Sequence, residues 1–442
     1  MKDKFYFDRH ETRMKVLEQF SMAHAENWQS NTTPLWVARD MTRLVEDTPD
    51  LRYVALFNIE FLEALVFDLG VPRDRIMFMA DNKYEAALAM TVYGVKTFEL
   101  PVDVRIPKRA IELVAEKITK AFYKGGTMPV TNNLVVFGNP PYQAEDGGHS
   151  KSAKPIYHLF VEAVIDCLSP RFFSFIIPSR WMAGGKGLGG HRARMRADRR
   201  VRVIKHFSGE QEVFKEVSIK GGVNYFLWDR GWSGKCNFNG VHRSLNEYDI
   251  ILSDNDAVSI LDKVLSIHPL GQFINETCLG SKPFGLRASF KNWVPSGIPC
   301  YTIRKERRYV SSNDFLDSNN VLNSWKVCTS EAIGPNSMGH FDKFGMLFVA
   351  GPGAVCTETY IVVNSFSSEV EAEKFIVYMK TRFFRFMLGL RVVTQHVNKA
   401  KFSWVPDMKD YTRVWTDADL YKKFGLTSEE IAYIESKIKE IA

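Results

Sequence analysis

The sequence predicts an α/β fold in which helices cover a mostly parallel sheet, followed by a smaller mixed α/β domain and C-terminal helices. In the first half of the chain, short apolar runs alternate with amphipathic stretches, the pattern of parallel strands joined by crossover helices. Two runs, LVVFG at 134–138 and FFSFII at 172–177, are apolar throughout, as in strands buried on both faces. Beyond about residue 256 the alternation stops, and Gly, Ser, Asn and Pro become frequent. These observations predict domains at 1–256 and 257–408 and a helical segment at 409–442.

The individual elements follow from the same apolar pattern. The expected strands are Tyr53–Phe57, Ile76–Ala80, Leu134–Gly138, Phe172–Ile177, Val201–Phe207 and Val223–Trp228. The expected helices are Leu35–Val45, Phe61–Asp68, Lys83–Tyr93, Ile106–Ala121 and Pro155–Cys167. Near the end, Thr416–Asp419 and Thr427–Glu430 predict two helix starts, the second with the sequence of a capping box, and Gly425 suits the stop between them.

Composition excludes several classes of protein. Six cysteines lie far apart without a C-x-x-C pair, which argues against zinc ribbons, redox motifs and disulfide-stapled domains. The ten histidines form no H-E-x-x-H or comparable spacing, so we predict no metal site. The charged start of the chain lacks the apolar core of a signal peptide, and no run approaches about eighteen apolar residues. We therefore expect a cytoplasmic protein without membrane segments.

The strongest chemical signal is the tetrapeptide Asn139-Pro140-Pro141-Tyr142, the NPPY motif, which directly follows LVVFG. At the carboxyl end of a buried strand, this rigid turn should face an active site. The Asn139 side chain and the Pro140 carbonyl group offer two hydrogen-bond acceptors, which suit an NH2 group on a planar conjugated molecule. Pulling on its hydrogens localises the nitrogen lone pair for attack on an electrophilic methyl group, and the Tyr142 ring can stack on the flat substrate. The apolar run argues against a turn that merely closes a strand.

A strand followed by NPPY resembles the catalytic motif of S-adenosylmethionine-dependent DNA adenine-N6 methyltransferases, notably the Eco57I-like restriction–modification methylases. Thr33-Pro34 resembles the N-terminal cofactor segment of that family, and Asp81 resembles the acid that binds the cofactor ribose. Further resemblances cover the later sheet motifs at 157–160, 172–180, 201–207 and 223–229 and the C-terminal helices at 416–435. The resemblance implies a Rossmann-like methyltransferase domain that binds S-adenosyl-L-methionine, followed by a DNA target-recognition domain at 257–408.

One departure from the family concerns the cofactor loop. The family has a glycine-rich turn after its first strand, whereas this chain reads Phe57-Asn58-Ile59-Glu60 there. Glycine would let the backbone approach the cofactor closely. Either the loop is shortened, with Phe57, Asn58 and Glu60 at the cofactor, or cofactor binding has been lost. The intact NPPY motif and Asp81 favour the first alternative.

The net charge of +7 is concentrated between Arg180 and Lys205, which hold nine basic residues and a single acid, Asp198. This basic segment begins just after an expected strand, so we expect it beside the NPPY motif. Its five glycines predict a mobile loop, and its basic side chains predict contacts with DNA phosphates; a solvated basic helix is the alternative. The expected DNA-binding residues are Lys186, Arg192, Arg194, Arg196, Arg199 and Arg200, with Lys282 and Arg287 in the second domain.

An adenine in duplex DNA must be rotated out of the base stack before its N6 can react. The flipped base needs two stacking faces, of which Tyr142 supplies one. In the family the second comes from an aromatic residue near a later strand, for which Tyr225 and Phe226 are the candidates. Neighbouring residues of a strand point to opposite faces, so at most one of the two can serve.

The resemblance implies a site-specific DNA methyltransferase (adenine-specific), EC 2.1.1.72, in which Asn139, Pro140, Pro141 and Tyr142 carry catalysis on double-stranded DNA. Two alternatives stay open: an NPPY-type methyltransferase acting on RNA or on protein glutamine, and a catalytically inactive methyltransferase-fold DNA-binding protein. The recognition sequence and a separate restriction endonuclease as partner also stay open.

Overall fold

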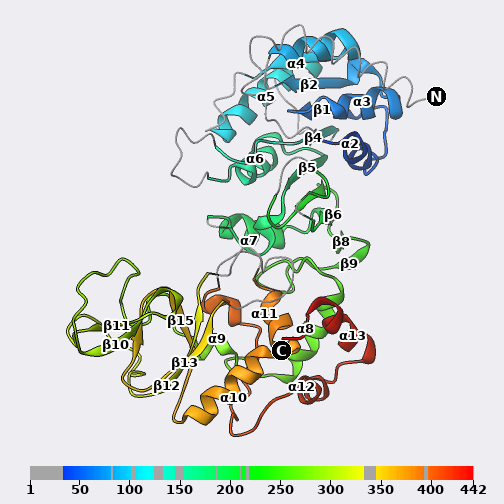
Figure 1. Cartoon of the computed structure of the whole chain (residues 1–442). Helices are drawn as coiled ribbons and strands as arrows, with labels where there is room; N and C mark the ends of the chain where they lie inside the picture. The colour runs from blue at the N-terminus through cyan, green and yellow to red at the C-terminus, as the bar shows by residue number, and fades with distance from the viewer. Residues whose placement is uncertain are drawn as a thin grey trace. The chain divides into compact units, whose positions relative to one another are not determined.

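The computed structural model describes residues 33–80, 83–100, 106–123, 133–144, 154–185, 187–209, 211–215, 219–332, 345–392 and 397–441. The chain divides into two compact units between Ser253 and Asp254 (Figure 1). This division falls in the region where the composition of the sequence changes. The expected α/β fold class is confirmed: the first unit holds the large, mostly parallel sheet, and the second holds smaller sheets and helices.

Within the described residues, the first unit is built on a nine-stranded sheet with the order β3-β2-β1-β4-β5-β7-β6-β8-β9. The strands are β1 (Arg52–Leu56), β2 (Ile76–Ala80), β3 (Lys96–Glu99), β4 (Leu134–Gly138), β5 (Phe172–Pro178), β6 (Val201–Phe207), β7 (Val223–Asp229), β8 (Cys236–Phe238) and β9 (Val241–Arg243). Strands β1 to β5 run parallel, whereas β7 lies antiparallel between β5 and β6. The carboxyl ends of β1, β4, β5 and β6 therefore share one edge, the carboxyl edge, and their starts share the opposite amino edge.

Helices pack on both faces of this sheet. They are α2 (Leu35–Thr42), α3 (Glu60–Glu63), α4 (Lys83–Leu88), α5 (Pro107–Phe122), α6 (Tyr157–Ala163) and α7 (Gly189–Ala197), with 3-10 turns η2 (Arg73–Arg75) and η5 (Ser179–Met182). Helices α3, α4 and α6 continue into π-helical turns at η1 (Ala64–Asp68), η3 (Ala89–Tyr93) and η4 (Val164–Leu168). Because successive strand residues face opposite sides, Val54 joins the core under α5 and α6, and Tyr53 joins the core under α2 and α3.

Helix α5 illustrates how the sequence determines these elements. Pro107 occupies the first turn, where its missing N–H costs nothing. Ala110, Ile111, Val114 and Ile118 recur at helical spacing and are all buried. Burying an aliphatic side chain of the larger kind contributes about 1.5–3 kcal/mol, so this face anchors the helix to the sheet.

Two glycines at the carboxyl edge are required by close packing. A Cβ atom at Gly138 would lie 2.7 Å from Phe175 Cε1 and 3.0 Å from the Leu56 carbonyl oxygen. Gly222, with a φ of +72°, would place a Cβ atom 1.9 Å from the Phe207 carbonyl oxygen. Neighbouring strands therefore crowd the backbone at both positions, and one of them directly precedes the NPPY motif.

The second unit combines two three-stranded sheets, β11-β10-β14 and β13-β12-β15, with helices. Its strands are β10 (Ile298–Tyr301), β11 (Arg307–Val310), β12 (Trp325–Ser330), β13 (Leu347–Ala350), β14 (Val355–Cys356) and β15 (Tyr360–Phe366). Its helical elements are α8 (Asp256–Ile267), α9 (Ile274–Thr277), η6 (Ile303–Lys305), α10 (Glu369–Lys380), α11 (Arg382–Gly389), η8 (Lys399–Phe402), α12 (Asp417–Lys423) and α13 (Ser428–Lys437). Capping boxes at Thr416 and Thr427 start the two C-terminal helices. The sequence predicted both helix starts but only the second capping box.

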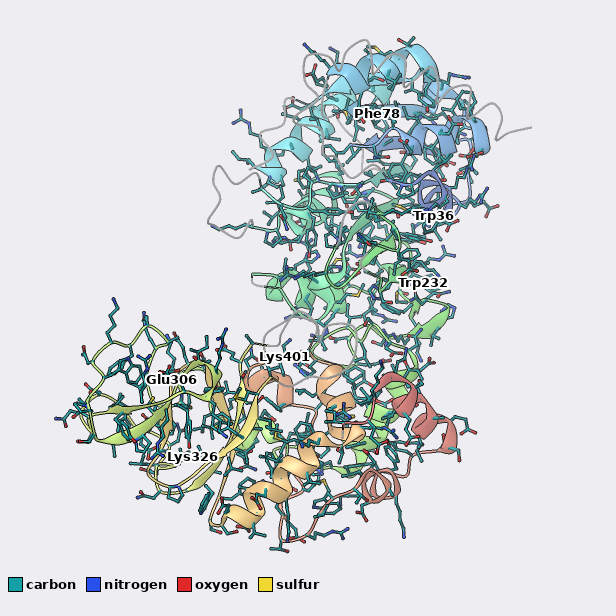
Figure 2. All side chains as sticks on the ribbon, viewed as in Figure 1. Trp36, Phe78, Trp232, Glu306, Lys326 and Lys401 are labelled. Atoms are coloured by element: carbon teal, nitrogen blue, oxygen red, sulfur yellow. The ribbon has the colours of Figure 1, made fainter. Side chains whose placement is uncertain are left out.

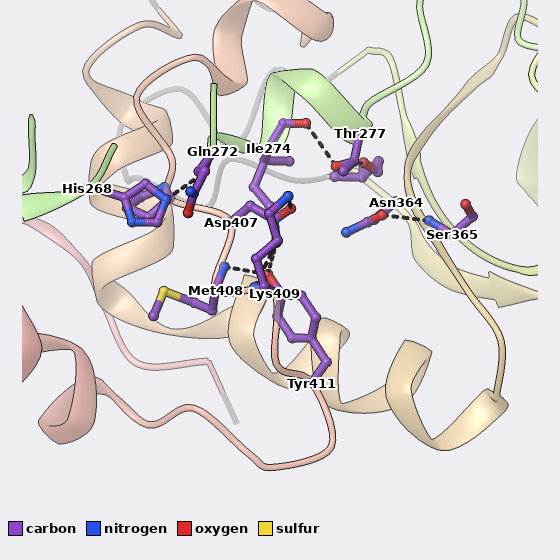
Figure 3. Close-up of polar contacts among 12 residues, drawn as sticks. His268, Gln272, Ile274, Thr277, Asn364, Ser365, Asp407, Met408, Lys409 and Tyr411 are labelled. Carbon is purple, nitrogen blue, oxygen red and sulfur yellow. Dashed lines mark hydrogen bonds and ion pairs between the residues drawn. The ribbon is translucent and has the colours of Figure 1, made fainter. Parts of the chain in front are cut away.

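A buried carboxylate organises the turn before those C-terminal helices. Asp407 is 2% exposed and accepts hydrogen bonds from Tyr411 Oη at 2.8 Å and from the backbone N–H of Lys409 at 3.1 Å (Figure 3). The Asp407 N–H in turn donates to the Gln272 carbonyl group at 2.9 Å. This network ties the end of the second unit to its beginning, and all of its polar groups are used structurally.

Lys326 on β12 is a second buried charge with a structural role (Figure 2). Its side chain is almost fully enclosed, and burial lowers its pKa. Its ammonium group donates to four backbone carbonyl oxygens, those of Val321, Leu322, Ser324 and Gly351, at 2.7–3.2 Å. Lys326 therefore binds two loops of its own unit together.

Candidate active site

The NPPY motif lies where the sequence placed it, at the carboxyl end of the fully buried strand β4. Strands β1 and β5 flank β4, and Gly138 pairs with Leu56 on one side and Phe175 on the other. Asn139 is 8% exposed and Pro140 is buried, while Pro141 is half-buried. The motif is thus held at the middle of the carboxyl edge, with the two acceptor residues on the inside.

Tyr142 is surrounded by aromatic rings from two other segments. Its ring centroid lies 6.4 Å from that of Tyr157 at the start of α6, and 6.3 Å from that of Phe214, with both partners nearly perpendicular to it. The ring is half-buried, but its hydroxyl oxygen is inaccessible and makes no hydrogen bond within the described residues. Burial raises the pKa of Tyr142 well above its usual value, so the side chain is neutral.

A buried polar network joins the ends of β5, β6 and β7 at the same edge. Ser179 Oγ lies 2.9 Å from His206 Nδ1, and Trp181 Nε1 donates to Asn224 Oδ1 at 3.1 Å. Burial lowers the pKa of His206 to about 4, so its ring is neutral at pH 7. Nothing in the spacing of these residues along the sequence indicated that they would meet. They give the carboxyl edge a polar but uncharged set of groups.

The predicted cofactor residues fall into three cases. Thr33 is fully buried directly before α2, and its hydroxyl group makes no hydrogen bond within the described residues. Pro34 precedes the helix and accepts its first backbone hydrogen bonds. Asp81 lies outside the described residues, directly after β2. An orphaned buried hydroxyl such as that of Thr33 fits a site in which a ligand supplies the partner.

The loop after β1, which contains no glycine, nevertheless makes a left-handed turn. Phe57 leaves β1 with a φ of 64°, a conformation that glycine adopts easily and phenylalanine rarely does. Its ring is buried against Phe160 at a centroid distance of 5.5 Å, which holds the turn in place. Asn58 Oδ1 then accepts the backbone N–H of Glu60 at 3.3 Å, and both side chains are buried. The loop therefore retains a tight turn at the carboxyl edge.

Within the described residues, neither stacking candidate from the sequence makes a ring contact with Tyr142. Phe226 is fully buried, and its ring packs on Phe173 at 5.1 Å. Tyr225 packs on Phe207 at 6.0 Å, and burial raises its pKa to about 12. Besides Tyr157, the aromatic residue that contacts the Tyr142 ring is Phe214. The available signal was an apolar pair, Val213-Phe214, in the loop between β6 and β7.

The basic segment forms helix α7 and the start of β6, so the expectation of a mobile loop is wrong for most of its length. Three of its arginines are held by the protein: Arg192 donates to the Trp181 and Gly184 carbonyl groups, Arg194 pairs with Asp166, and Arg196 donates to Asn246. Arg200 pairs with Asp198 at 2.7 Å, and Arg199 is exposed. Lys186 lies outside the described residues.

The beginning of the basic segment and its last residue, Lys205, lie toward the carboxyl edge, whereas the part between α7 and β6 does not. Helix α7 carries the chain across the sheet, and β6 starts at the amino edge, where Val201 pairs with Trp228. Arg199 and Arg200 directly precede β6 and are therefore separated from the NPPY motif by the length of a strand, about 20 Å. The expectation that the whole segment borders the motif is wrong for these two residues.

The predicted DNA-binding residues of the second unit lie in one loop. Lys282 has a φ of 60° and forms an ion pair with Glu358 at 3.5 Å, while Arg287 is exposed. Across the described residues, no three His, Cys, Asp or Glu side chains are grouped as metal ligands. The described helices also include none long and apolar enough to cross a membrane.

Known proteins match this chain in the segment that contains the NPPY motif. Residues 133–214 match the family of the Eco57I restriction-modification methylase. An uncharacterized adenine-specific methylase of Mycoplasma pneumoniae is 34% identical over 108 residues, which are 24% of this chain and 25% of that relative. The chain thus aligns with about a quarter of the length of this curated relative.

Solved structures of restriction–modification enzymes are more distant. The type IIG restriction endonuclease BpuSI matches 96% of this chain and 63% of its own, at 9% identity and a TM-score of 0.43. The type I restriction-modification methyltransferase subunit of Streptococcus thermophilus matches 46% of this chain and 45% of its own, at 14% identity and a TM-score of 0.32. The resemblance read from the sequence is confirmed where it is most specific: residues 133–214, which contain the NPPY motif, Tyr157 and Phe214, match the Eco57I restriction–modification methylase family.

Proposed function

We propose that the protein transfers a methyl group from S-adenosyl-L-methionine to N6 of an adenine that is rotated out of duplex DNA. One observation carries this proposal. The NPPY motif stands at the carboxyl edge with the Tyr142 ring between Tyr157 and Phe214, within the segment that matches restriction–modification methylases. When bound, S-adenosyl-L-methionine supplies an electrophilic methyl group.

The protein's contribution is to orient the amine. The Asn139 side-chain carbonyl and the Pro140 backbone carbonyl accept the two N6 hydrogens, which localises the nitrogen lone pair and stabilises the positive charge that develops on nitrogen. After the transfer, the nitrogen releases one proton to water, so no strong general base is required.

Several buried groups support a cofactor site next to the motif. The candidates to hold S-adenosyl-L-methionine are Thr33, whose hydroxyl group makes no hydrogen bond within the described residues, Pro34, and the turn Phe57-Asn58-Glu60, with Asp81 at the ribose. The left-handed backbone conformation of Phe57 keeps the turn of the cofactor loop. It therefore favours a shortened loop that binds the cofactor over a loop that has lost cofactor binding.

We assign the second stacking face to Phe214 rather than to Tyr225 or Phe226. A flipped base needs an aromatic partner at the pocket, and Phe214 is the ring in contact with Tyr142 from the loop after β6. For the DNA backbone, we retain Lys186, Arg192, Arg194 and Arg196 as candidates. Arg199 and Arg200 would reach only DNA that extends beyond the pocket.

The replacement Asn139→Ala tests the proposal directly. It should reduce the transfer of labelled methyl groups to duplex DNA by about a hundredfold or more, while DNA binding measured by gel shift is retained. Asn133→Ala is the matched control, because Asn133 precedes β4 at the amino edge and donates to the Asp50 carbonyl group at 2.9 Å. Undiminished transfer by Asn139→Ala would overturn the proposal.

The alternative substrates are separated by one comparison. Labelled methyl transfer to duplex DNA, RNA and protein is measured side by side with the unmodified protein. Transfer to RNA or protein alone would replace the adenine assignment, and the absence of S-adenosyl-L-methionine binding at millimolar concentration would favour an inactive DNA-binding protein. Sequencing of the exposed DNA for modified adenines would also give the recognition sequence.

A further inference from the structure

The turn between β10 and β11 has an unusual backbone. Arg304 and Lys305 both adopt left-handed conformations, with φ of 58° and 61°. Two consecutive residues with side chains rarely do so, because Cβ crowds the backbone there. Such a turn persists only where its surroundings hold it, and strained turns of this kind cluster at functional sites.

The surroundings of the turn hold it firmly. Tyr360 on β15 is 1% exposed, and its hydroxyl oxygen accepts the backbone N–H of Lys305 at 2.7 Å. At the base of the turn, the Thr302 N–H donates to the Glu306 carbonyl group at 2.8 Å, and Thr302 Oγ1 donates to the same oxygen at 3.2 Å. The backbone is therefore fixed from the core of the unit.

What this rigid turn presents outward is basic and partly apolar. All six residues from 303 to 308 are exposed (Figure 2 labels Glu306 among them). Ile303 is 65% exposed, so most of its aliphatic side chain is in contact with solvent. Four of the six are basic, and the single acid, Glu306, is paired with Arg308 at 3.0 Å.

The hairpin is linked through backbone hydrogen bonds to the loop that contains Lys282 and Arg287. The connection between β14 and β15 joins the two: the Thr357 N–H donates to the Tyr301 carbonyl group at 3.1 Å, and the Glu358 N–H donates to the Leu286 carbonyl group at 2.9 Å. Arg287 is exposed at the end of that loop. The hairpin and the loop that carries Arg287 are therefore held by one connection of the second unit.

We propose that the β10–β11 hairpin tip enters the major groove of the substrate duplex and reads bases with Ile303, Arg304 and Lys305. This inference rests on the proposed function, since it assumes duplex DNA as the substrate. A two-stranded ribbon fits the major groove, a guanidinium group can donate to guanine O6 and N7, and an aliphatic side chain can contact a thymine methyl group. Contacts with phosphates tolerate a loose side chain, whereas base contacts need a fixed backbone. The pinned left-handed turn supports base reading.

The test uses the full-length protein and a library of duplexes with randomised sequence. Methylated adenines are sequenced after reaction, and bound duplexes are separately selected and sequenced. The double replacement Arg304→Gly/Lys305→Gly keeps the backbone conformation and removes both side chains. It should relax the preferred sequence at one or two positions and lower binding to the preferred duplex about tenfold or more. Tyr360→Phe keeps the ring in the core, removes the hydrogen bond to the turn, and should relax the same positions more weakly.

Arg413→Ala is the matched control, because Arg413 is an exposed arginine of the same unit that pairs with Asp419 at 3.0 Å near α12. It should leave the preferred sequence unchanged. An unchanged preference in the double replacement, or an equal loss of binding to all sequences with a flatter salt dependence, would overturn base reading. If the unmodified protein binds DNA with a sequence preference but transfers no methyl group, the proposed function fails while the selection still decides the role of the hairpin. Absence of DNA binding would overturn both.

Discussion

The two edges of the nine-stranded sheet differ in their chemistry. The carboxyl edge carries the NPPY motif, aromatic rings and a histidine that burial keeps neutral. The amino edge carries arginines that pair with acids or lie over indole rings: Arg171 and Arg202 with Asp229, Arg200 with Asp198, Arg200 over Trp228 at 4.6 Å, and Arg202 over Trp232 at 5.1 Å (Trp232 is labelled in Figure 2). Charge and the proposed chemistry therefore lie mostly on opposite edges of one sheet.

This difference separates two roles for the basic residues. At the amino edge, Asp198 and Asp229 neutralise much of the local charge, and the indole rings contribute cation–π contacts of about 0.5–1 kcal/mol each where they are exposed. These arginines stabilise the fold. Positive charge available to DNA from the basic segment must come mainly from its first part, from Arg199 and from the exposed Lys205.

The largest expected effect breaks the crowded carboxyl edge. In Gly222→Ala, the new Cβ atom would lie 1.9 Å from a backbone oxygen of β6. Because β6 is paired with β7, this backbone cannot move away to relieve the clash. The first unit should lose about 4 kcal/mol or more of its free energy of unfolding, or fail to fold, as measured by urea denaturation. Gly240→Ala is the control: its φ is +91°, but no atom lies within 4 Å of the new Cβ, so its loss should stay near 1–2 kcal/mol. Equal losses would assign the effect to backbone angle rather than crowding.

The second prediction concerns the amino edge. Asp229→Ala removes the partner of Arg171 and Arg202 and the acceptor of the Gly231 N–H at 2.9 Å. Because both arginines are partly exposed, the free energy of unfolding should fall by about 2 kcal/mol rather than by the larger loss typical of fully buried pairs. The kcat of methyl transfer, measured below the unfolding temperature, should not change. Arg199→Ala should cost less than about 0.5 kcal/mol, and a drop in kcat for Asp229→Ala would link the amino edge to the chemistry.

The smallest effect distinguishes the aromatic residue at the pocket from those in the core. Phe214→Leu should lower kcat/KM for duplex DNA about tenfold, because a stacking contact with the flipped base contributes about 1–3 kcal/mol. Phe226→Leu should instead lower the free energy of unfolding by about 1–1.5 kcal/mol and leave kcat/KM unchanged. The reverse result would restore Phe226 to the stacking role that the sequence suggested.

The sequence predicted those parts of the fold that depend on local information. Strand β4 and helix α5 are specified by their own apolar patterns, and the NPPY motif is placed by the strand before it. Strand β3 was missed because its residues Lys96–Glu99 are short, mixed in polarity and at the end of the sheet. Helix α7 was predicted only as the alternative to a loop, because Gly189 and Gly190 disfavour a helix by about 1 kcal/mol each. The helix forms because Met195 and His191 are buried in the unit.

The site was predictable to the same extent. Asn139 and Tyr142 follow from one motif, but the Phe214 contact depends on how a polar loop folds back over the sheet. The pairing of Arg200 with Asp198 and Trp228, like the arrival of Arg199 at the amino edge, depends on the path of α7. Charge counts along a sequence carry no information about such partners.

The crowding at Gly138 has a consequence for protein design. The residue contacts no proposed substrate, yet Phe175 and Leu56 leave no room for a side chain there. In a mutational scan scored by methylation, Gly138 should resemble a catalytic residue, although the loss would come from misplaced strands. A designer who transfers the motif to another sheet must therefore move five residues, GNPPY, and match the two neighbouring strands. What can be transferred is therefore the motif together with the ends of β4 and its neighbours β1 and β5, rather than the turn alone.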